Sequence, residues 1–348
     1  MNTPRILADH DLQPLNTLAV PARAARYAQA GDEESLREAL SFARAEGMPV
    51  LVLGGGSNVV LPARFEGLAI RVAIKGVEIV AEDGEFVYVR AGAGEVWQDL
   101  VEFTLQRNLQ GLENLSLIPG TVGAAPIQNI GAYGVELDTV FESLTAIDRQ
   151  SLETLAFDAP ACEFSYRDSI FKHRLRDAVV ITAVTFRLRK KGELNTSYAP
   201  LHEALSAIPA NELTPRQVSD AVIAIRRSKL PDPAEIPNAG SFFKNPIVSA
   251  DKHESLKRDY PQLVSFPAGA GRVKLAAGWL LEQAGWRGHR QDGVGMHAAQ
   301  ALVLVNPGRR EGEYVLEYAA RIQRDVYERF GVMLEREPVA YVPQGETA

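Results

Sequence analysis

The amino-acid sequence predicts an α+β fold that is divided between at least two domains. The chain has 348 residues, of which 46% are hydrophobic and 23% charged, which is typical of a globular protein too long for one small core. Strand and helix patterns are mixed along it without the regular strand–helix repeat of a doubly wound sheet. The charged stretch Arg189–Gly192 and the polar residues behind it interrupt the apolar pattern. We therefore expect a domain boundary near residues 190–212.

The first half of the chain contains predicted elements of both kinds. Residues 32–47 predict a helix, because Leu36, Leu40 and Ala43 share one face and Gly47 stands where the helix would end. The other elements predicted here are strands at Pro49–Leu53, Leu68–Val72, Phe86–Ala91 and Val180–Leu188, the last with alternating burial, and a helix near Val96–Leu105.

The second half begins with a helix signal at Thr214 and Pro215, a capping residue followed by proline in the first turn. Val218, Val222 and Ile225 then form an apolar face. The remaining predicted elements are a helix at Leu275–Ala284, a strand at Ala301–Val305 and a helix at Glu313–Phe330 that ends at Gly331.

Composition and charge argue against several classes of protein. The net charge is −7, so the chain as a whole offers no basic surface for nucleic acid. No apolar run approaches the roughly 20 residues of a membrane span, and the N-terminus lacks a signal-peptide pattern. The single cysteine, Cys162, and the scattered histidines fit neither a disulfide nor a metal site. We expect a cytoplasmic monomer without a metal, a nucleic-acid partner or a membrane partner.

A glycine-rich loop follows the first predicted buried strand. The strand residue Leu53 is followed directly by Gly54, Gly55, Gly56, Ser57 and Asn58. Glycines let the backbone N–H groups approach an anion closely, and the serine and asparagine add side-chain donors. The loop lacks the lysine of a Walker loop and the spacing of a dinucleotide fingerprint. Taken alone, it fits a phosphate site and a tight turn between strands about equally well.

A second glycine-rich stretch runs from Ile118 to Tyr133. Gly120, Gly123 and Gly131 stand there among small residues, with few side chains that could build a core. Such a stretch favours close backbone contact with something large and flat, either a neighbouring sheet or an aromatic cofactor. One loop suited to phosphate and one suited to a ring system together indicate a nucleotide cofactor such as a flavin.

The segment Asn238–Pro246 combines apolar anchors with polar groups. Phe242 and Phe243 can anchor it, and Gly240 gives the backbone freedom. Ser241 lies between Gly240 and the two phenylalanines. A buried hydroxyl without a partner costs about 1–3 kcal/mol, so this serine needs a hydrogen-bond partner or a function, such as that of a positioned proton donor. Taken alone, the segment slightly favours a glycine-containing turn that enters a strand.

Two charged residues are further candidates. Arg167, within Tyr166–Ser169, could hold a carboxylate through two hydrogen bonds. Glu337 precedes a proline at the expected start of a strand. Residues of both types more often lie on the surface than in a site.

Several segments together resemble the UDP-N-acetylenolpyruvoylglucosamine reductase family. In chain order they are Asn16–Leu18, Gly54–Asn58, Ile118–Ala125, Tyr166–Ser169, Lys229–Pro233, Asn238–Pro246 and Lys274–Leu281. The resemblance spans residues 15–342, and its last two motifs are long and specific. It implies an FAD-binding domain in two lobes, of the vanillyl-alcohol-oxidase type, followed by a smaller α+β substrate-binding domain.

The resemblance also implies domain bounds. The FAD-binding domain would cover residues 15–190, with its lobes dividing near residue 70. A connecting segment with Tyr198 would cover 191–212. The substrate-binding domain would cover 213–342, with its last strand returning to the FAD domain, and residues 343–348 would form a disordered tail.

The implied reaction belongs to the synthesis of peptidoglycan precursors. NADPH would reduce bound FAD, and hydride from the flavin N5 would then pass to the terminal enolpyruvyl carbon of UDP-N-acetylglucosamine enolpyruvate. Protonation of the neighbouring carbon would give UDP-N-acetylmuramate.

The resemblance assigns roles to individual residues. Ser241 matches the proton donor, Arg167 the arginine that holds the substrate carboxylate, and Glu337 the catalytic glutamate, although Glu335 stands two residues away and leaves a register alternative. Tyr198, from the subgroup with a tyrosine on a closing loop, Lys229 and Asn245 match substrate contacts. The implied FAD contacts are Asn16, Thr17, Leu53, Gly54, Gly55, Gly56, Ser57, Asn58, Pro119, Gly120, Thr121, Gly123, Ala124, Gln128, Asn129, Gly131, Ala132 and Tyr133.

Two other interpretations fit these segments less well. A flavin oxidase of alcohols or hydroxy acids would share the two-lobed fold, but we do not expect Ser241–Pro246 or Lys229–Pro233 in such an enzyme. A nucleotide-binding module without catalysis would not need Arg167, Ser241 and Glu337 together.

Overall fold

The computed structural model describes residues 5–341, and these divide into two compact units. Unit 1 comprises residues 5–10, 24–56 and 66–228, and unit 2 comprises residues 11–23, 57–65 and 229–341. The predicted tail at 343–348 lies outside the described residues.

Unit 2 contains two short segments from the N-terminal part of the chain. The carbonyl of Thr17 accepts a hydrogen bond from the N–H of Asn238 at 3.0 Å, and that of Leu18 accepts one from Asn306 Nδ2 at 3.0 Å. Strand β4 (Val59–Val60) pairs in parallel with β20 (Val339–Ala340). The units therefore divide the chain differently from the domain bounds expected from the sequence, which placed both short segments in the first domain.

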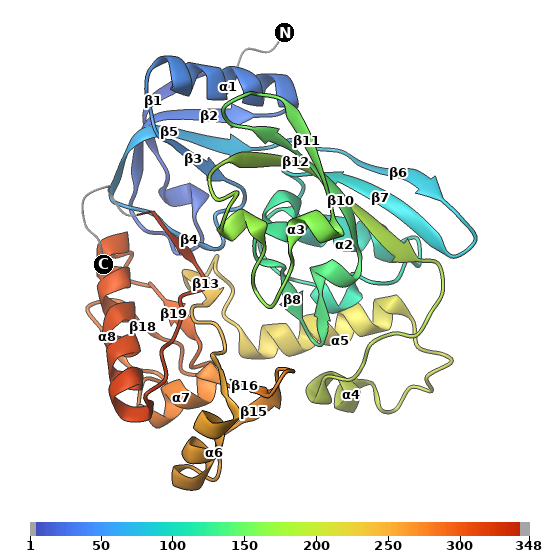
Figure 1. Ribbon diagram of the computed structural model, residues 1–348, viewed down its shortest axis with the longest axis vertical. Coiled ribbons are helices and arrows are strands. Elements are labelled where there is room, and N and C mark those ends of the chain that lie inside the picture. The colour runs from blue at the N-terminus through green and yellow to red at the C-terminus, as the bar shows by residue number, and fades with distance from the viewer. Residues whose placement is uncertain (1–4, 342–348) are drawn as a thin grey trace. The chain divides into compact units, whose positions relative to one another are not determined.

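The first sheet of unit 1 has four strands and is covered by helix α1 (Glu33–Ala45), as Figure 1 shows. In spatial order the strands are β1 (Leu7–Asp11), β2 (Arg23–Ala30), β5 (Arg64–Val72) and β3 (Val50–Leu53). The predicted helix at 32–47 is confirmed, with Asp32 and Ser35 forming a capping box at its start. Leu36 and Leu40 are buried in the same core as Leu68 and Ile70 of β5.

The second sheet of unit 1 has five antiparallel strands. In spatial order they are β11 (Thr154–Asp158), β10 (Phe141–Asp148), β12 (Val179–Arg189), β7 (Phe86–Gly92) and β6 (Val77–Glu82). The expectation that buried and exposed side chains alternate along Val180–Leu188 is wrong for the first half of this strand, where residues 180–184 are all buried. Strand β12 is central in the sheet, and both of its faces are covered at that end.

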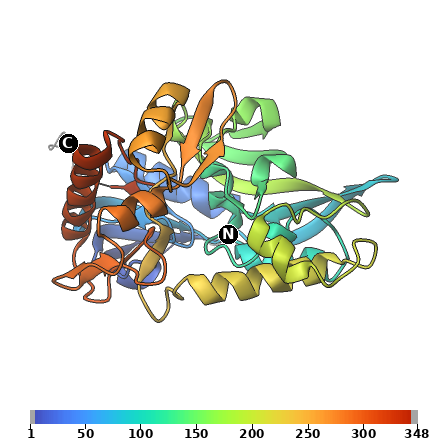
Figure 2. The same ribbon diagram turned by 90° about the horizontal axis from the view of Figure 1, so that it is seen from below.

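Helices and short turns complete unit 1, and the long helix α5 is yellow in Figure 2. The α-helices are α2 (Trp97–Leu105), α3 (Ala159–Cys162), α4 (Ala199–Leu205) and α5 (Pro215–Lys229), whose last residue belongs to unit 2. The 3-10 turns are η2 (Glu113–Leu115), η3 (Val122–Ala124), η4 (Pro126–Gln128), η5 (Leu137–Thr139) and η6 (Ile170–Lys172), and β8 (Gly131–Ala132) pairs with β9 (Val135–Glu136).

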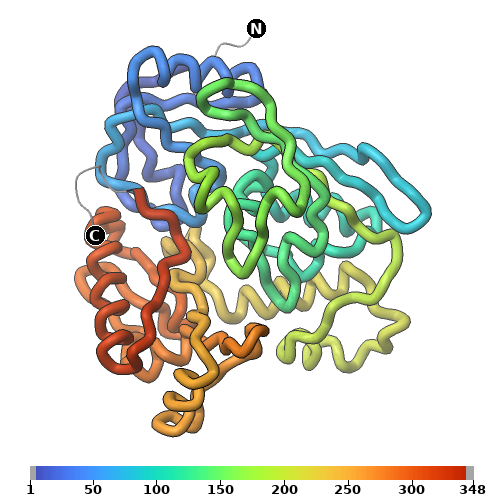
Figure 3. The backbone as a smooth tube through the Cα atoms, viewed as in Figure 1, coloured from blue at the N-terminus to red at the C-terminus, as the bar shows by residue number. Residues whose placement is uncertain are grey.

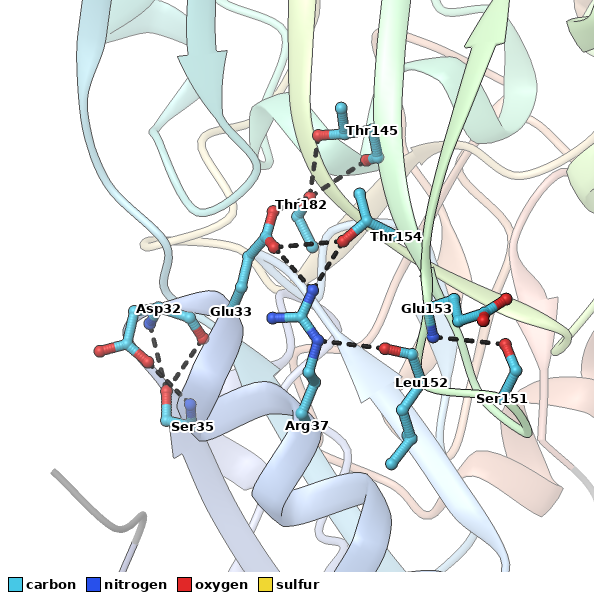
Figure 4. Close-up of polar contacts among 10 residues, drawn as sticks. All are labelled: Asp32, Glu33, Ser35, Arg37, Thr145, Ser151, Leu152, Glu153, Thr154 and Thr182. Carbon is cyan, nitrogen blue, oxygen red and sulfur yellow. Dashed lines mark hydrogen bonds and ion pairs between the residues drawn. The ribbon is translucent and has the colours of Figure 1, made fainter. Parts of the chain in front are cut away.

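A polar network joins α1 to the second sheet of the same unit (Figure 4). Arg37 Nη2 donates to Glu33 Oε2 at 3.0 Å and to Thr154 Oγ1 at 2.6 Å, and Arg37 Nε donates to the carbonyl of Leu152 at 3.1 Å. The hydroxyl of Thr182 on β12 donates to Glu33 Oε1 at 3.0 Å. These bonds hold the helix that covers the first sheet against strands β11 and β12 of the second.

Besides the β4–β20 pair, the described part of unit 2 contains two small sheets and three α-helices. One sheet has the order β13 (Asn238–Ser241), β19 (Val303–Val305), β18 (Val294–Met296) and β17 (Arg290–Gln291), and the other has β14 (Ile247–Ser249), β16 (Arg272–Leu275) and β15 (Ser265–Pro267). The helices are α6 (Ala250–Asp259), α7 (Ala277–Gln283) and α8 (Gly312–Phe330), with the short turn η1 (Gln13–Leu15). Helices α7 and α8 were predicted, whereas α6 was not, because Leu256 is its one buried residue and leaves no apolar stripe to detect.

A buried carboxyl group in unit 1 gives a pH prediction. Burial raises the pKa of Glu113, although hydrogen bonds from backbone N–H groups, first that of Gly111, act in the opposite direction. A carboxyl group with a raised pKa in the folded state binds protons more readily when folded, so its contribution to stability falls as the pH rises above the unfolded value of 4.5.

We therefore expect the free energy of unfolding of the parent protein to fall with pH relative to that of Glu113→Gln, which cannot titrate. The difference between the two proteins should change by up to about 1.4 kcal/mol for each pH unit between the ordinary glutamate pKa and the raised pKa of the folded state, and stay constant above it. Urea unfolding of both proteins at a series of pH values measures it. A difference that stays constant with pH would show that Glu113 does not titrate abnormally.

Candidate active site

A β-bulge sets the position of Ser241 at the end of strand β13. Asn238 pairs with Val305 and Ser241 pairs with Val303, so three steps along β13 face two along β19. Gly240 lies within the bulge at φ 70°, a left-handed conformation that costs other residues about 1–2 kcal/mol. The Asn238 side-chain oxygen accepts a hydrogen bond from the Gly240 N–H at 2.9 Å. Because a bulge redirects the side chain that follows it, this local sequence determines where the Ser241 hydroxyl points.

The two phenylalanines behind Ser241 anchor the segment as the sequence predicted. Phe242 and Phe243 have no exposed surface, and their rings meet edge-to-face at 5.4 Å. The N–H of Phe242 donates to the carbonyl of Leu302 at 2.9 Å. The serine is therefore attached to a rigid part of unit 2.

The end of the described chain runs antiparallel to this segment, as the red and orange parts of the tube in Figure 3 show. Phe243 forms a bridge with Arg336, and the N–H of Glu337 donates to the carbonyl of Phe242 at 2.9 Å. Glu337 is therefore opposite the residue that follows Ser241. The structure brings these two predicted catalytic residues, 96 positions apart in the chain, onto neighbouring segments of unit 2.

The two neighbouring glutamates differ in their surroundings. The side chain of Glu335 is 68% exposed and forms an ion pair with Lys244, whose own side chain is 11% exposed. Glu337 is partly buried, and its carbonyl accepts a hydrogen bond from Asn58 Nδ2 at 3.4 Å. Since the Glu335 side chain is largely exposed whereas Glu337 is partly buried, Glu337 is the better candidate for a role with a substrate.

The other candidate residues in unit 2 are placed as follows. Asn245 Oδ1 accepts a hydrogen bond from the N–H of Ala277 at 2.9 Å, which leaves its Nδ2 group as the donor for a ligand. Lys229 is the last residue of α5 and is exposed. The Asn16 side chain bonds to the backbone of Leu12 and Val20, so it shapes its own loop. The neighbouring Thr17 hydroxyl is buried and has no hydrogen-bond partner among residues 5–341.

In unit 1 the two glycine-rich loops lie directly against each other. A Cβ at Gly55 would come within 2.8 Å of Gly120 Cα, and one at Gly54 would overlap the hydroxyl of Thr121. That hydroxyl is buried and finds no hydrogen-bond partner within the described part of the chain. Because the glycines lack side chains, the two loops can approach each other closely. Their backbone N–H groups, together with the unpaired Thr121 hydroxyl, suit a phosphate-bearing cofactor.

Arg167 lies at the tip of a tight turn. The backbones of Ser165 and Asp168 exchange two hydrogen bonds of 3.1 Å, with Tyr166 and Arg167 between them and Arg167 at φ 54°. The hydroxyl of Ser169 donates to the carbonyl of Ile127 at 2.6 Å. The motif Tyr166–Ser169 is thus a turn fastened to the second glycine-rich loop.

The Arg167 guanidinium contacts that loop directly. Its Nη1 donates to the carbonyl of Asn129 at 3.4 Å and to Glu136 Oε1 at 3.5 Å, and its Nη2 donates to the carbonyl of Gly131. The side chain of Asn129 is occupied as well, since its Nδ2 donates to the carbonyl of Ser165 at 3.1 Å. Asn129, one of the predicted cofactor contacts, therefore has its side chain and both of its backbone groups engaged within unit 1.

The far end of the second loop meets the segment that contains Tyr198. The rings of Tyr133 and Tyr198 are 5.2 Å apart and nearly perpendicular. Burial raises the pKa of Tyr133. Tyr198 directly precedes α4 and is 42% exposed. The other predicted contacts of this loop are Pro119, Gly123 and Ala124 around η3, Gln128 at the end of η4 and Ala132 in β8.

The predicted site residues thus form two groups, one in each unit. Ser241, Glu337, Asn58, Asn245 and Lys229 belong to unit 2, and Arg167, Tyr133, Tyr198 and both runs of glycines belong to unit 1. Sequence reasoning missed Glu136, which contacts Arg167, and gave Asn238 no role of its own, although it positions the bulge at Ser241. Each lies within six residues of a glycine of a predicted loop, which is the signal that could have drawn attention to it.

Two family models match separate parts of the chain. A model of the C-terminal domain of UDP-N-acetylenolpyruvoylglucosamine reductase matches residues 232–341, and a model of an FAD-binding domain matches residues 24–151. The UDP-N-acetylenolpyruvoylglucosamine reductase of Pseudomonas aeruginosa is 52% identical over 336 residues, which cover 96% of this chain and 99% of the relative. The chain belongs to the UDP-N-acetylenolpyruvoylglucosamine reductase family.

Another member of the family supports this placement, and two solved structures share the fold. The reductase of Paraburkholderia phytofirmans is 50% identical over 335 residues, covering 96% of this chain and 97% of the relative. The crystal structure of the reductase from Thermus caldophilus has a TM-score of 0.67 at 22% identity, covering 97% and 99% of the two chains. The structure of 4-ethylphenol oxidase from Gulosibacter chungangensis has a TM-score of 0.53 at 12% identity, covering 91% of this chain and 82% of the oxidase. The predicted α+β fold with a vanillyl-alcohol-oxidase-type FAD domain is confirmed.

As a member of the reductase family with an FAD-binding domain, the chain is an FAD-dependent oxidoreductase. The glycine-rich loops in unit 1 and the unpaired Thr121 hydroxyl fit this cofactor. In residues 5–341 no group of three His, Cys, Asp or Glu residues is arranged to hold a metal ion. Nor does any helix of this described part have the length and apolar character needed to cross a membrane.

Proposed function

We propose that this reductase uses NADPH to reduce the enolpyruvyl ether of UDP-N-acetylglucosamine to the lactyl ether of UDP-N-acetylmuramate, in the cytoplasm and for peptidoglycan synthesis. The near-complete match to the Pseudomonas aeruginosa reductase carries the proposal. The pairing of the Ser241 and Glu337 segments in unit 2 supports it, because this reaction needs a proton donor beside a second acidic group.

Each protein group has a task set by the charge that develops in the substrate. When bound, FAD supplies the hydride that the terminal enolpyruvyl carbon accepts. The neighbouring carbon and its carboxylate then carry negative charge, and Arg167 is the cation assigned to hold that carboxylate. The Ser241 hydroxyl donates its proton to the carbon, and Glu337 in its acid form donates a hydrogen bond to the enolate. Lys229, Asn245 and Tyr198 are assigned to the rest of the substrate, and the two glycine-rich loops to FAD.

Anaerobic reduction in two steps tests the proposal. NADPH should bleach the flavin absorbance of the purified holoenzyme, and UDP-N-acetylglucosamine enolpyruvate should restore it rapidly. A flavin that bleaches and then stays reduced would leave the fold intact and overturn the substrate. A flavin that NADPH does not bleach would overturn the electron donor.

Gly131 gives a prediction about Arg167. A Cβ at this position would come within 2.6 Å of Arg167 Nη1 and 2.8 Å of Glu136 Cγ, so Gly131→Ala must displace the guanidinium. We expect the variant to lose about 1–3 kcal/mol of stability through overpacking. We also expect reoxidation by the enolpyruvyl substrate to slow at least about tenfold, since displacement weakens the stabilisation of developing charge.

The matched control is Gly84→Ala, because a Cβ there would meet nothing within 4 Å. Thermal unfolding and stopped-flow reoxidation of both variants provide the measurement. Parent-like reoxidation by Gly131→Ala would argue against the assignment of Arg167 to the substrate carboxylate.

A further inference from the structure

The hairpin at the end of the second glycine-rich loop places a carboxylate beside Arg167. Strands β8 and β9 pair so that Glu136 stands directly opposite Gly131. The Glu136 carboxylate and the Gly131 carbonyl therefore reach the same guanidinium, the first through Nη1 at 3.5 Å and the second through Nη2. Gly131 leaves room for both side chains, since a Cβ there would come within 2.8 Å of Glu136 Cγ and 2.6 Å of Arg167 Nη1. The pairing of two short strands thus sets an acidic group beside the cation.

Both oxygens of the Glu136 carboxylate face hydrogen-bond donors. Its Oε1 accepts from Arg167 Nη1 at 3.5 Å, and its Oε2 accepts from Asn129 Nδ2 at 3.4 Å. A carboxylate can accept at both oxygens, whereas the amide of a glutamine has one acceptor and would turn its NH2 group toward one of the two donors. Glutamate is therefore a side chain that can bridge Asn129 and Arg167, and glutamine of the same length is not.

Asn129 gives this bridge a fixed end. It has no exposed surface, and it ends η4 at φ 43°. Its Oδ1 accepts a hydrogen bond from the N–H of Asp138 at 3.0 Å, and its Nδ2 donates to the carbonyl of Ser165 at 3.1 Å. Ser165 opens the turn that carries Arg167. The same asparagine thus holds the turn, the hairpin and the Glu136 carboxylate in one arrangement.

Partial burial makes the orientation of Arg167 depend on these contacts. Its side chain is 16% exposed, and that of Glu136 is 33% exposed. Charges that are partly shielded from water interact more strongly than charges at the surface, and a buried cation that loses its partner is costly. The backbone carbonyls of Asn129 and Gly131 hold the same guanidinium. Removal of the carboxylate leaves those two carbonyls, so the cation stays in the unit but its direction is less restricted.

We propose that Glu136 is a positioning residue, which fixes the direction in which Arg167 presents its charge to the substrate carboxylate. The guanidinium then needs no reorientation when negative charge develops on the enolate, which is the advantage of a preorganised group. The proposal rests on the proposed function in taking Arg167 as the partner of the substrate carboxylate. Glu136 acts through Arg167 rather than on the reacting atoms.

Three substitutions in the holoenzyme test this role. Glu136→Gln keeps the length of the side chain but cannot accept from both donors. Glu136→Asp keeps the charge but is one methylene shorter, so it cannot bridge the two donors. Glu78→Gln is the control, because Glu78 of β6 lies at the same 3.5 Å from Arg90 in the same unit, with a side chain that is 63% exposed.

Stopped-flow absorbance of the two half-reactions measures the effect. In Glu136→Gln and Glu136→Asp we expect FAD to remain bound and NADPH to reduce it at the parent rate. At saturating enolpyruvyl substrate, reoxidation should be about 10–100-fold slower in both variants, since a small misplacement of a catalytic group can cost this much. The control should match the parent in both half-reactions.

A double-mutant cycle shows whether Glu136 acts through Arg167. Glu136→Gln added to Arg167→Ala should slow reoxidation no further, because the group that Glu136 positions is already gone. A purely structural role would instead slow reoxidation by the same factor in both backgrounds.

Reoxidation of Glu136→Gln at the rate of the control would overturn the proposal, and so would equal slowing in the Arg167→Ala background. A parent-like Glu136→Asp beside a slow Glu136→Gln would show that charge alone matters, which would overturn the positioning role. Loss of FAD, or slow reduction by NADPH, would assign Glu136 to the cofactor loop instead. A parent enzyme whose reduced flavin ignores the enolpyruvyl compound would overturn the proposed function itself, and with it the role of Arg167.

Discussion

Ser241→Ala should bind FAD and be reduced by NADPH at the parent rate, yet its reduced flavin should be reoxidised by the enolpyruvyl substrate about 10²–10⁴-fold more slowly, the usual contribution of a positioned general acid. The physical reason is that the bulge at Gly240 positions this hydroxyl and the substitution removes its proton without removing the anchors Phe242 and Phe243. Stopped-flow absorbance of the two half-reactions measures the effect separately for each.

Ser255→Ala is the matched control for this experiment, because it makes the same substitution within helix α6 of the same unit. It should behave as the parent in both half-reactions. If Ser241→Ala were reoxidised as fast as the control, the proton would have to come from another group. If its reduction by NADPH were slowed equally, the serine would act in cofactor placement instead.

The second large effect is expected at Glu337, and it separates two residues that the sequence alone leaves ambiguous. Glu337→Gln keeps the shape and the backbone hydrogen bond to Phe242 but removes the acidic proton. We expect reoxidation by the substrate to slow by about 10²-fold or more, since a neutral amide stabilises the developing enolate less well than a carboxylic acid.

Glu335→Gln provides the comparison, since it makes the same change two residues away. Its carboxylate is exposed and paired with Lys244, so its loss should cost no more than about 1 kcal/mol of stability and leave reoxidation unchanged. Transient kinetics and urea unfolding of both variants make the comparison. The reverse ranking of reoxidation rates would move the catalytic role to Glu335.

Local sequence patterns predicted most of the elements but not all of them. Helix α1 was predictable because its apolar face, its acidic first turn and Gly47 agree with one another. Helix α6 was not, because it buries Leu256 alone and its remaining residues carry no period. Strand β12 was predicted with the wrong burial pattern, since coverage of both faces depends on what packs against a sheet.

The candidate site shows the same division. Motifs along the chain indicated Ser241, Arg167 and Glu337, and the glycine-rich loops indicated a nucleotide cofactor. No pattern indicated that Glu136 pairs with Arg167, because the two residues are 31 positions apart.

The sequence by itself determined the family, the α+β class and the identity of the residues that can carry the chemistry, because residue type and order are properties of the chain. Only the tertiary structure decided that Glu337 stands opposite Phe242, beside Ser241, while Glu335 pairs with Lys244 at the surface. That choice depends on the register between two segments distant in the sequence, and packing and hydrogen bonding in the folded unit fix this register.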